Sequence, residues 1–169
     1  MSLMLVALSL HPDSSRDPVE AITVEIARRA NGRVMLRYEV AGDIDKLRIP
    51  TAGTPSRASE LWKHTCFEAF VTRPDGAYDE FNFSPAGSWA AYRFDSYRRG
   101  MRERETLPPG IEVKRSDRTL ILLASPELPE TGMLGLSAVI ETGEGGISYW
   151  ALAHAPGRAG LSPFGRLRD

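Results

Sequence analysis

The feature that most constrains the fold is a period-two alternation of apolar and polar residues, interrupted by turn residues at short intervals. Across 21–29, every second residue from Ile22 to Ile26 is apolar, which places these side chains on one face of an extended strand. Asn31-Gly32 follows, and because both residues tolerate a positive φ, the pair is a strong hairpin signal. The alternation resumes over 33–40. No long segment shows the 3.6-residue period of an amphipathic helix, so the sequence predicts an all-β chain.

The same pattern recurs to the end of the chain and divides it into about ten strands. We expect an antiparallel β-sandwich, jelly-roll-like, in a single domain that covers 1–169. The expected strands are 3–10, 21–29, 33–40, 43–49, 64–72, 78–83, 88–97, 111–114, 119–124, 134–141 and 147–152. We expect a loop at 51–59, which contains Gly, Pro and hydroxyl residues. Little in the sequence indicates helix, and 126–131 is the segment that could form one helical turn.

The charge balance argues against a nucleic-acid partner. The chain has 21 basic and 22 acidic residues and a formal net charge of −1, whereas domains that bind a phosphate backbone usually carry a clear basic excess. The stretch 93–104 holds five arginines among aromatic residues, but acidic residues interrupt it. We therefore interpret this stretch as a solvated edge of the sheet.

The cellular location follows from two features. The single cysteine, Cys66, excludes an intrachain disulfide, so nothing requires an oxidising compartment. The apolar stretch 3–10 is far shorter than the roughly 20 residues that span a bilayer, and it lacks the charged start of a secretion signal. We expect a cytoplasmic protein without membrane contact, in which residues 1–3 are an expression leader ahead of Met4.

The residues that could carry metal or nucleophilic chemistry stand in no recognisable pattern. His64 and Cys66 share a face if they lie on one strand, but their spacing matches no zinc motif, and we interpret them as a rim imidazole beside a core thiol. No nucleophile elbow surrounds Cys66. Glu68, Asp79 and Glu80 could supply a carboxylate pair, but nothing in the sequence sets their separation. We expect no catalytic residue, metal or cofactor.

The position of Trp62 is more informative. It stands at the end of a loop, just before a strand, where an indole ring either packs on the core or remains exposed at the rim. Sugar rings present apolar C–H faces that pack on aromatic rings, and their hydroxyls need carboxylate, amide or guanidinium partners. Glu68 on the same strand and Asn82 on the next could supply such groups. These three residues are the candidate ligand-binding site.

Several segments resemble a known family. Leu-Trp-Lys-His-Thr-Cys-Phe-Glu-Ala-Phe-Val at 61–71 is similar to the Trp…Glu strand of family 9 carbohydrate-binding modules and the related DOMON-like domains. Tyr-Asp-Glu-Phe-Asn-Phe-Ser-Pro-Ala-Gly at 78–87 resembles the strand and turn that follow. Segments 147–150 and 164–167 resemble the last strands of the family. The resemblance therefore runs from about residue 61 to the C-terminus.

The resemblance implies a jelly roll in which two aromatic rings clamp a terminal sugar. Trp62 would be the first ring, Glu68 would accept from hydroxyls, and Asn82 falls where some members use Arg. The family's Asp after the Trp is replaced here by the stretch 63–65. The second ring is expected within 154–160, which contains no aromatic residue, although Arg158 could stack on a sugar instead. A site with one ring is expected to bind weakly.

We therefore predict a non-catalytic module that binds a saccharide or a sugar-containing small molecule. One alternative is a structural or protein-interaction domain without a small ligand. The other is a haem binder, because some DOMON-like domains hold haem between a Met and a His. The candidate haem ligands are Met35, Met101, Met133, His64 and His154.

Overall fold

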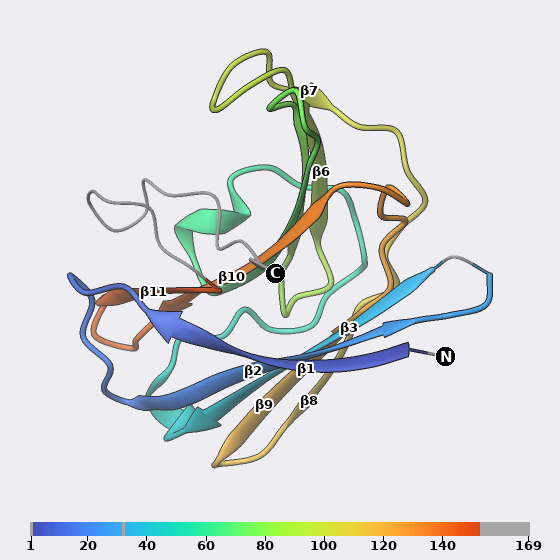
Figure 1. Cartoon of the computed structure of the whole chain (residues 1–169). Helices are drawn as coiled ribbons and strands as arrows, with labels where there is room; N and C mark the ends of the chain where they lie inside the picture. Colours follow the sequence, from blue (N-terminus) through green and yellow to red (C-terminus); the bar gives the residue numbers. More distant parts are fainter. Residues whose placement is uncertain (1, 32, 153–169) are drawn as a thin grey trace.

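The strands form one antiparallel sheet that curls until its two halves face each other, as the computed structural model in Figure 1 shows. The structure describes residues 2–31 and 33–152. The strands are β1 (Ser2–Leu10), β2 (Val19–Arg28), β3 (Val34–Gly42), β4 (Cys66–Thr72), β5 (Tyr78–Phe83), β6 (Trp89–Phe94), β7 (Arg102–Glu103), β8 (Glu112–Arg115), β9 (Thr119–Ala124), β10 (Met133–Glu141) and β11 (Ile147–Ala151). Two 3-10 helices, η1 (Ile44–Lys46) and η2 (Leu61–Lys63), interrupt the connection from β3 to β4.

The strand order is β7-β6-β5-β4-β10-β11-β1-β2-β3-β9-β8. β1 joins the halves, because it pairs with β2 along most of its length and with β11 only at Ser9 and Leu10. The core lies between the two halves, and its largest fully buried side chains include Tyr38, Phe67, Phe81, Phe83 and Trp150. The predicted all-β, antiparallel sandwich-like fold is confirmed.

The two halves differ in how many faces they bury. Along β3 the buried and half-buried residues alternate strictly, as the period-two pattern predicts for a strand with one solvated face. Every residue of β4 is buried, so both faces of its half are covered. One face packs on the core. The other carries a second apolar cluster, formed by Phe70, Tyr78, Ala90, Tyr92 and Phe94.

One predicted strand is wrong. The segment 43–49 contains the 3-10 helix η1, and only Leu47 makes an isolated bridge, to Thr142. The two buried apolar residues, Ile44 and Leu47, are three apart, which suits a 3-10 turn and not a strand. Asp43 begins the turn, because its carbonyl accepts from the Lys46 N–H at 3.2 Å.

Two smaller features also differ from the sequence analysis. The segment 126–131 forms no helical turn, and Pro129 within it lacks the N–H that such a turn would use. The two-residue strand β7 was not predicted, since so short a stretch shows no alternation.

No helix in the described part of the chain is long and apolar enough to cross a membrane.

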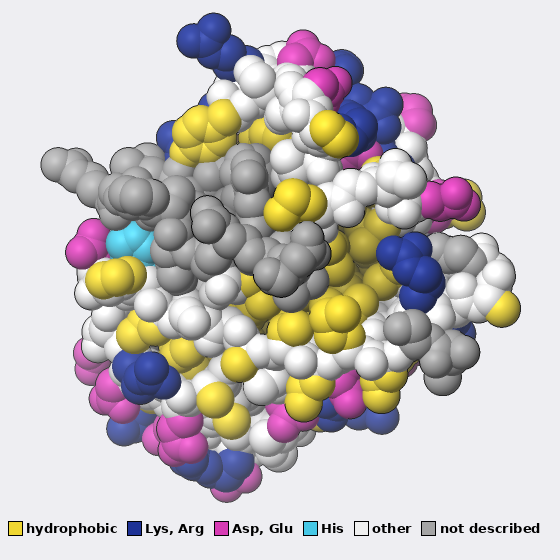
Figure 2. All heavy atoms as spheres, in the orientation of Figure 1, with side chains coloured by type: hydrophobic (Ala, Val, Ile, Leu, Met, Phe, Trp, Pro, Cys, Tyr) yellow, Lys and Arg dark blue, Asp and Glu magenta, His cyan; other side chains and the backbone are white. Residues whose placement is uncertain are grey.

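The face of the molecule seen in Figure 2 carries basic and acidic side chains intermixed around an apolar centre. No single sign of charge dominates this view. This arrangement agrees with the near-zero net charge of the chain.

Candidate ligand-binding site

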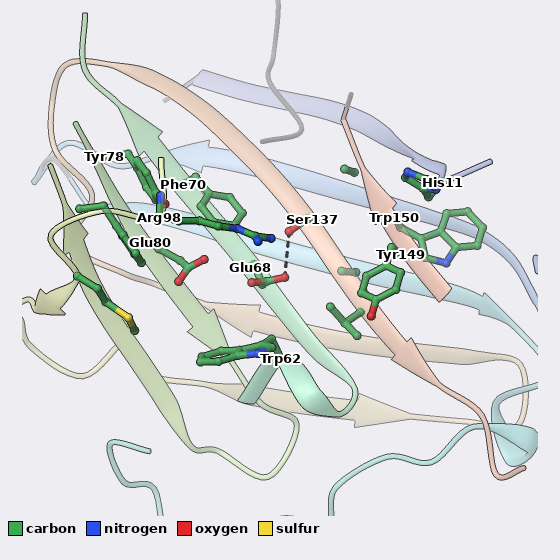
Figure 3. Close-up of a pocket in the computed structure, with 15 residues that line it drawn as sticks. His11, Trp62, Glu68, Phe70, Tyr78, Glu80, Arg98, Ser137, Tyr149 and Trp150 are labelled. Atoms are coloured by element: carbon green, nitrogen blue, oxygen red, sulfur yellow. Dashed lines mark hydrogen bonds between the residues drawn. The ribbon is translucent and has the colours of Figure 1, made fainter. Parts of the chain in front are cut away.

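A pocket of about 450 Å³ opens on the face of β4, β5 and β10 that points away from the core. This size lies within the range of small-molecule sites. Figure 3 shows its lining side chains rising from neighbouring strands and from two loops. The lining residues are His11, Trp62, Glu68, Phe70, Tyr78, Glu80, Phe94, Arg98, Met101, Ser137, Ala138, Val139, Tyr149, Trp150 and Ala151.

Trp62 forms one edge of this pocket. Glu60 adopts a left-handed conformation (φ 58°) and begins η2, whose backbone bonds run from Lys63 to Glu60 and from His64 to Leu61. This tight turn leaves the Trp62 side chain 37% exposed, on the same side of the sheet as the pocket glutamates (Figure 3). Trp62 therefore belongs to neither buried cluster, and its ring is available for stacking.

Glu68 lies in the floor of the pocket, at the centre of β4. The Ser137 hydroxyl on β10 donates to its Oε1 at 3.3 Å. The surrounding acceptors favour the orientation of the Asn82 amide in which its nitrogen faces Glu68. In that orientation Asn82, on β5, donates to Oε2 at 3.1 Å. The backbone of Glu68 is fixed from the opposite half of the sandwich, because the buried Tyr38 hydroxyl donates to its carbonyl oxygen at 2.7 Å. The carboxyl group is thus held by neighbours on both sides of β4.

Glu80 on β5 shares this face. The register pairs Glu68 with Asn82 and Phe70 with Glu80, so the two glutamates are diagonal neighbours, roughly 7–8 Å apart at the backbone. Burial raises the pKa of Glu68 from 4.5 to about 7. Burial, together with the charge of Glu68, raises the pKa of Glu80 from 4.5 to about 8. Near neutral pH the pair therefore retains a proton, and it can both donate and accept hydrogen bonds.

Arg98 reaches over the pocket from the loop between β6 and β7, toward Glu68 and Ser137 (Figure 3). Its backbone is left-handed (φ 58°), and its N–H donates to the Tyr78 hydroxyl at 3.3 Å. Gly100 closes the loop at φ 71°, where an added Cβ would clash with the Asp95 carboxylate. The loop therefore depends on glycine there, and it brings a guanidinium to a pocket whose lining includes two glutamates and several aromatic rings.

Tyr149 lines the pocket from β11 and adds an aromatic ring on the side of the pocket formed by that strand (Figure 3). The sequence indicated no second ring, because the resemblance directed the search to 154–160. That segment and Arg158 lie outside the described residues. Trp150 is 2% exposed and packs in the core.

The other predicted site residues have different surroundings. Asn82 is fully buried and supports Glu68 without lining the pocket. His64 precedes β4, is exposed, and pairs with Glu141 at 3.1 Å, whereas Cys66 is buried. The interpretation of a rim imidazole and a core thiol is therefore confirmed, but the two residues do not share a strand face.

The candidate haem ligands are not gathered at the pocket. Met101 is the one that lines it within the described part of the chain, and His154 lies outside that part. Among residues 2–31 and 33–152, no group of three or more His, Cys, Asp or Glu side chains could hold a metal ion.

The third candidate carboxylate, Asp79, faces away from the pocket. It is fully buried, and three guanidinium groups surround it: Arg73 at 3.4 Å, Arg93 at 3.0 Å and Arg104 at 3.0 Å. The arginine-rich stretch 93–104 is thus divided between this ion-pair cluster and the pocket loop. It is more than the solvated edge that its charge pattern indicated.

Comparisons with known proteins bear on the fold. No protein-family model matches the chain, and no curated protein matches it. The crystal structure of a proposed carbohydrate-binding protein from Bacteroides uniformis is similar, with a TM-score of 0.63 over 97% of this chain and 85% of that one. The sequence identity is 14%, so the likeness shows a shared fold. Membership of the family 9 modules or the DOMON-like domains stays a prediction.

Proposed function

We propose that this chain is a non-catalytic module that binds a saccharide in the pocket between Trp62, Glu68 and Glu80. The observation that carries the proposal is the placement of an exposed indole beside hydrogen-bonding carboxyl groups in one pocket. The solved structure of similar fold belongs to a proposed carbohydrate-binding protein, which supports the same class of ligand.

The chemistry of the pocket suits a sugar ring. A pyranose can lay its C–H face on the Trp62 indole, and its edge then meets the polar floor of the pocket. Glu68 is already oriented by Ser137 and Asn82, so it loses little side-chain freedom when a hydroxyl binds. Tyr149 supplies an aromatic wall from β11, which partly replaces the second ring expected from the resemblance.

The surroundings of Cys66 and His64, the candidate nucleophile and base, favour a binding role over a catalytic one. Burial, with a smaller effect from the Glu68 charge, raises the pKa of the Cys66 thiol well above its ordinary value. A thiol so protonated is a poor nucleophile. His64 is turned to Glu141 and is not a base for Cys66. The described residues therefore contain no assembled Cys–His pair.

The test is calorimetric titration of the protein with a panel of mono- and oligosaccharides, repeated with Trp62→Ala and Trp62→Phe. We expect saturable binding that weakens at least about tenfold in Trp62→Ala and is largely kept in Trp62→Phe, which retains a ring. Leu107→Ala is the control, because Leu107 is exposed outside the pocket. Binding that is equal in wild type and Trp62→Ala would refute this site.

A further inference from the structure

The acidic side chains on β4 and β5 differ in whether a basic side chain pairs with them. Asp79 is surrounded by three arginines, each within 3.4 Å. Its chain neighbour Glu80 points to the opposite face, where no described Lys, Arg or His nitrogen comes within 4.0 Å of its carboxylate. The same holds for Glu68, whose described partners are the neutral Ser137 and Asn82. Asp79 therefore has counterions, and within the described part of the chain the two pocket acids have none at contact distance.

Two like charges without counterions are costly in a partly buried site. Arg98 is the guanidinium that lines the pocket, and it lies 5.2 Å from the Tyr97 ring centroid. Once both glutamates are ionised, this guanidinium and the two carboxylates together carry a net negative charge, whereas the proton that the pair retains near neutral pH offsets it. Among the described residues, no side chain donates a hydrogen bond to the Glu80 carboxyl group, which lines the pocket.

We propose, on the basis of the saccharide function above, that the ligand of this pocket is a sugar bearing a protonated amine, whose ammonium group binds between Glu68 and Glu80. An ammonium has three donors, which suits two facing carboxylates. The Trp62 indole beside them attracts a cation as well as a C–H face. Ca²⁺ takes six to eight oxygen ligands, more than this pair and the Ser137 hydroxyl supply.

The other ionisable groups around the pair come from several elements. They are Cys66 on β4, Tyr78 on β5, Tyr92 on β6, Tyr149 on β11, His11 after β1 and Arg98 in the loop before β7. None of the thiol and phenol groups carries a positive charge in any state. His11 accepts a hydrogen bond at Nδ1 from the Asp13 N–H (3.1 Å). The guanidinium of Arg98 reaches toward Glu68, so the ammonium enters a site that holds two carboxyl groups and one guanidinium (Figure 3).

The proposal has a second consequence, since the pair holds a proton near neutral pH. Burial keeps the pKa values of Glu68 and Glu80 at about 7 and about 8. A bound ammonium favours the ionised carboxylates, so an aminosugar releases protons when it binds. A neutral sugar does not change the protonation of the pair, so its binding releases no protons.

The experiment compares glucosamine, galactosamine and mannosamine with their parent hexoses and N-acetyl derivatives, by calorimetry near pH 6.5 in two buffers of different ionisation heat. We expect each amine to bind about tenfold more tightly than its neutral counterparts and to release protons, because a charge-assisted hydrogen bond is stronger than a neutral one. This preference should be lost in Glu80→Gln and kept in Glu112→Gln, since Glu112 is exposed on β8, away from the pocket.

The outcomes separate the two proposals. Equal affinity for amines and neutral sugars, or a preference that survives Glu80→Gln, overturns the aminosugar proposal and leaves saccharide binding intact. If none of the sugars binds, both proposals fail. Tight amine binding that Trp62→Ala leaves unchanged would keep the ammonium site and overturn the stacking platform.

Discussion

The stability of this protein should fall as the pH rises from about 5 to about 8. The folded state holds protons on Glu68 and Glu80 that the unfolded chain has already lost, because burial raises both pKa values from 4.5, to about 7 and about 8. Where the folded state binds more protons, the free energy of unfolding decreases with pH. The loss begins near the unfolded value of 4.5 and is complete once both folded values are passed.

The magnitude follows from the structure. For Glu68, a rise from 4.5 to about 7 corresponds to about 3 kcal/mol of stability lost above pH 7. Glu80 contributes less than its pKa alone implies, because it is only half-buried and solvent in the pocket screens it. A loss of several kcal/mol is a large part of the stability of a domain of this size.

The perturbation that isolates this effect is Glu68→Gln. Glutamine keeps the shape of the side chain, it can accept from Ser137, and the Asn82 amide can rotate to accept from the new NH₂ group. The variant should match wild type at pH 5 and exceed it by about 3 kcal/mol at pH 8. It should also lower the pKa of Glu80, which the Glu68 charge helps to raise.

The assay is urea unfolding followed by fluorescence at half-unit steps from pH 5 to pH 9, with exposed Glu112→Gln as the matched control. The control should have the same pH dependence as wild type. A wild-type profile that is flat over this range, or a Glu68→Gln variant no more stable than wild type at pH 8, would show that the pocket acids are compensated and that the argument is wrong.

Three further outcomes are expected. Tyr38→Phe should lower the unfolding free energy by about 1 kcal/mol in the same assay, because the buried Glu68 carbonyl loses its donor. Asp79→Asn should lower the unfolding free energy by about 3 kcal/mol, since three arginines lose their counterion. A change under about 1 kcal/mol would mean that solvent already screens these charges. Cys66 should react with a thiol reagent only at the rate of unfolding, and rapid labelling of the native protein would contradict its burial.

The strands were predictable wherever turn residues bounded a regular alternation. The predicted limits of 78–83 and 119–124 agree with β5 and β9 residue for residue. The prediction failed at 43–49, where Ile44 and Leu47 are buried at a spacing of three. The local pattern thus predicted the fold class and most strand limits to within about two residues, and it failed where a short 3-10 turn replaced the expected strand.

The site was only partly predictable. Trp62 could be found because a tryptophan in a loop just before a strand either packs on the core or stays exposed at the rim. Glu68 could be found because it is a carboxylate on the strand that follows. The signal for Glu80 was weak: it is a polar residue two positions before Asn82, so both side chains lie on the same face of the strand. Arg98 and Tyr149 had no such signal. Arg98 reaches the pocket through the loop after β6, and Tyr149 reaches it because β10 pairs with both β4 and β11.

The chemistry of the pocket depends on register more than on composition. Asp79 and Glu80 are adjacent acids on one strand, yet one faces three arginines and the other faces the pocket. A slip of one residue between β4 and β5 would exchange them, because successive side chains point to opposite faces. The Asp75-Gly76 turn, with Gly76 at φ 91°, and the pairing of Glu68 with Asn82 hold the register. Whichever ligand binds, its partners are therefore selected by this hairpin.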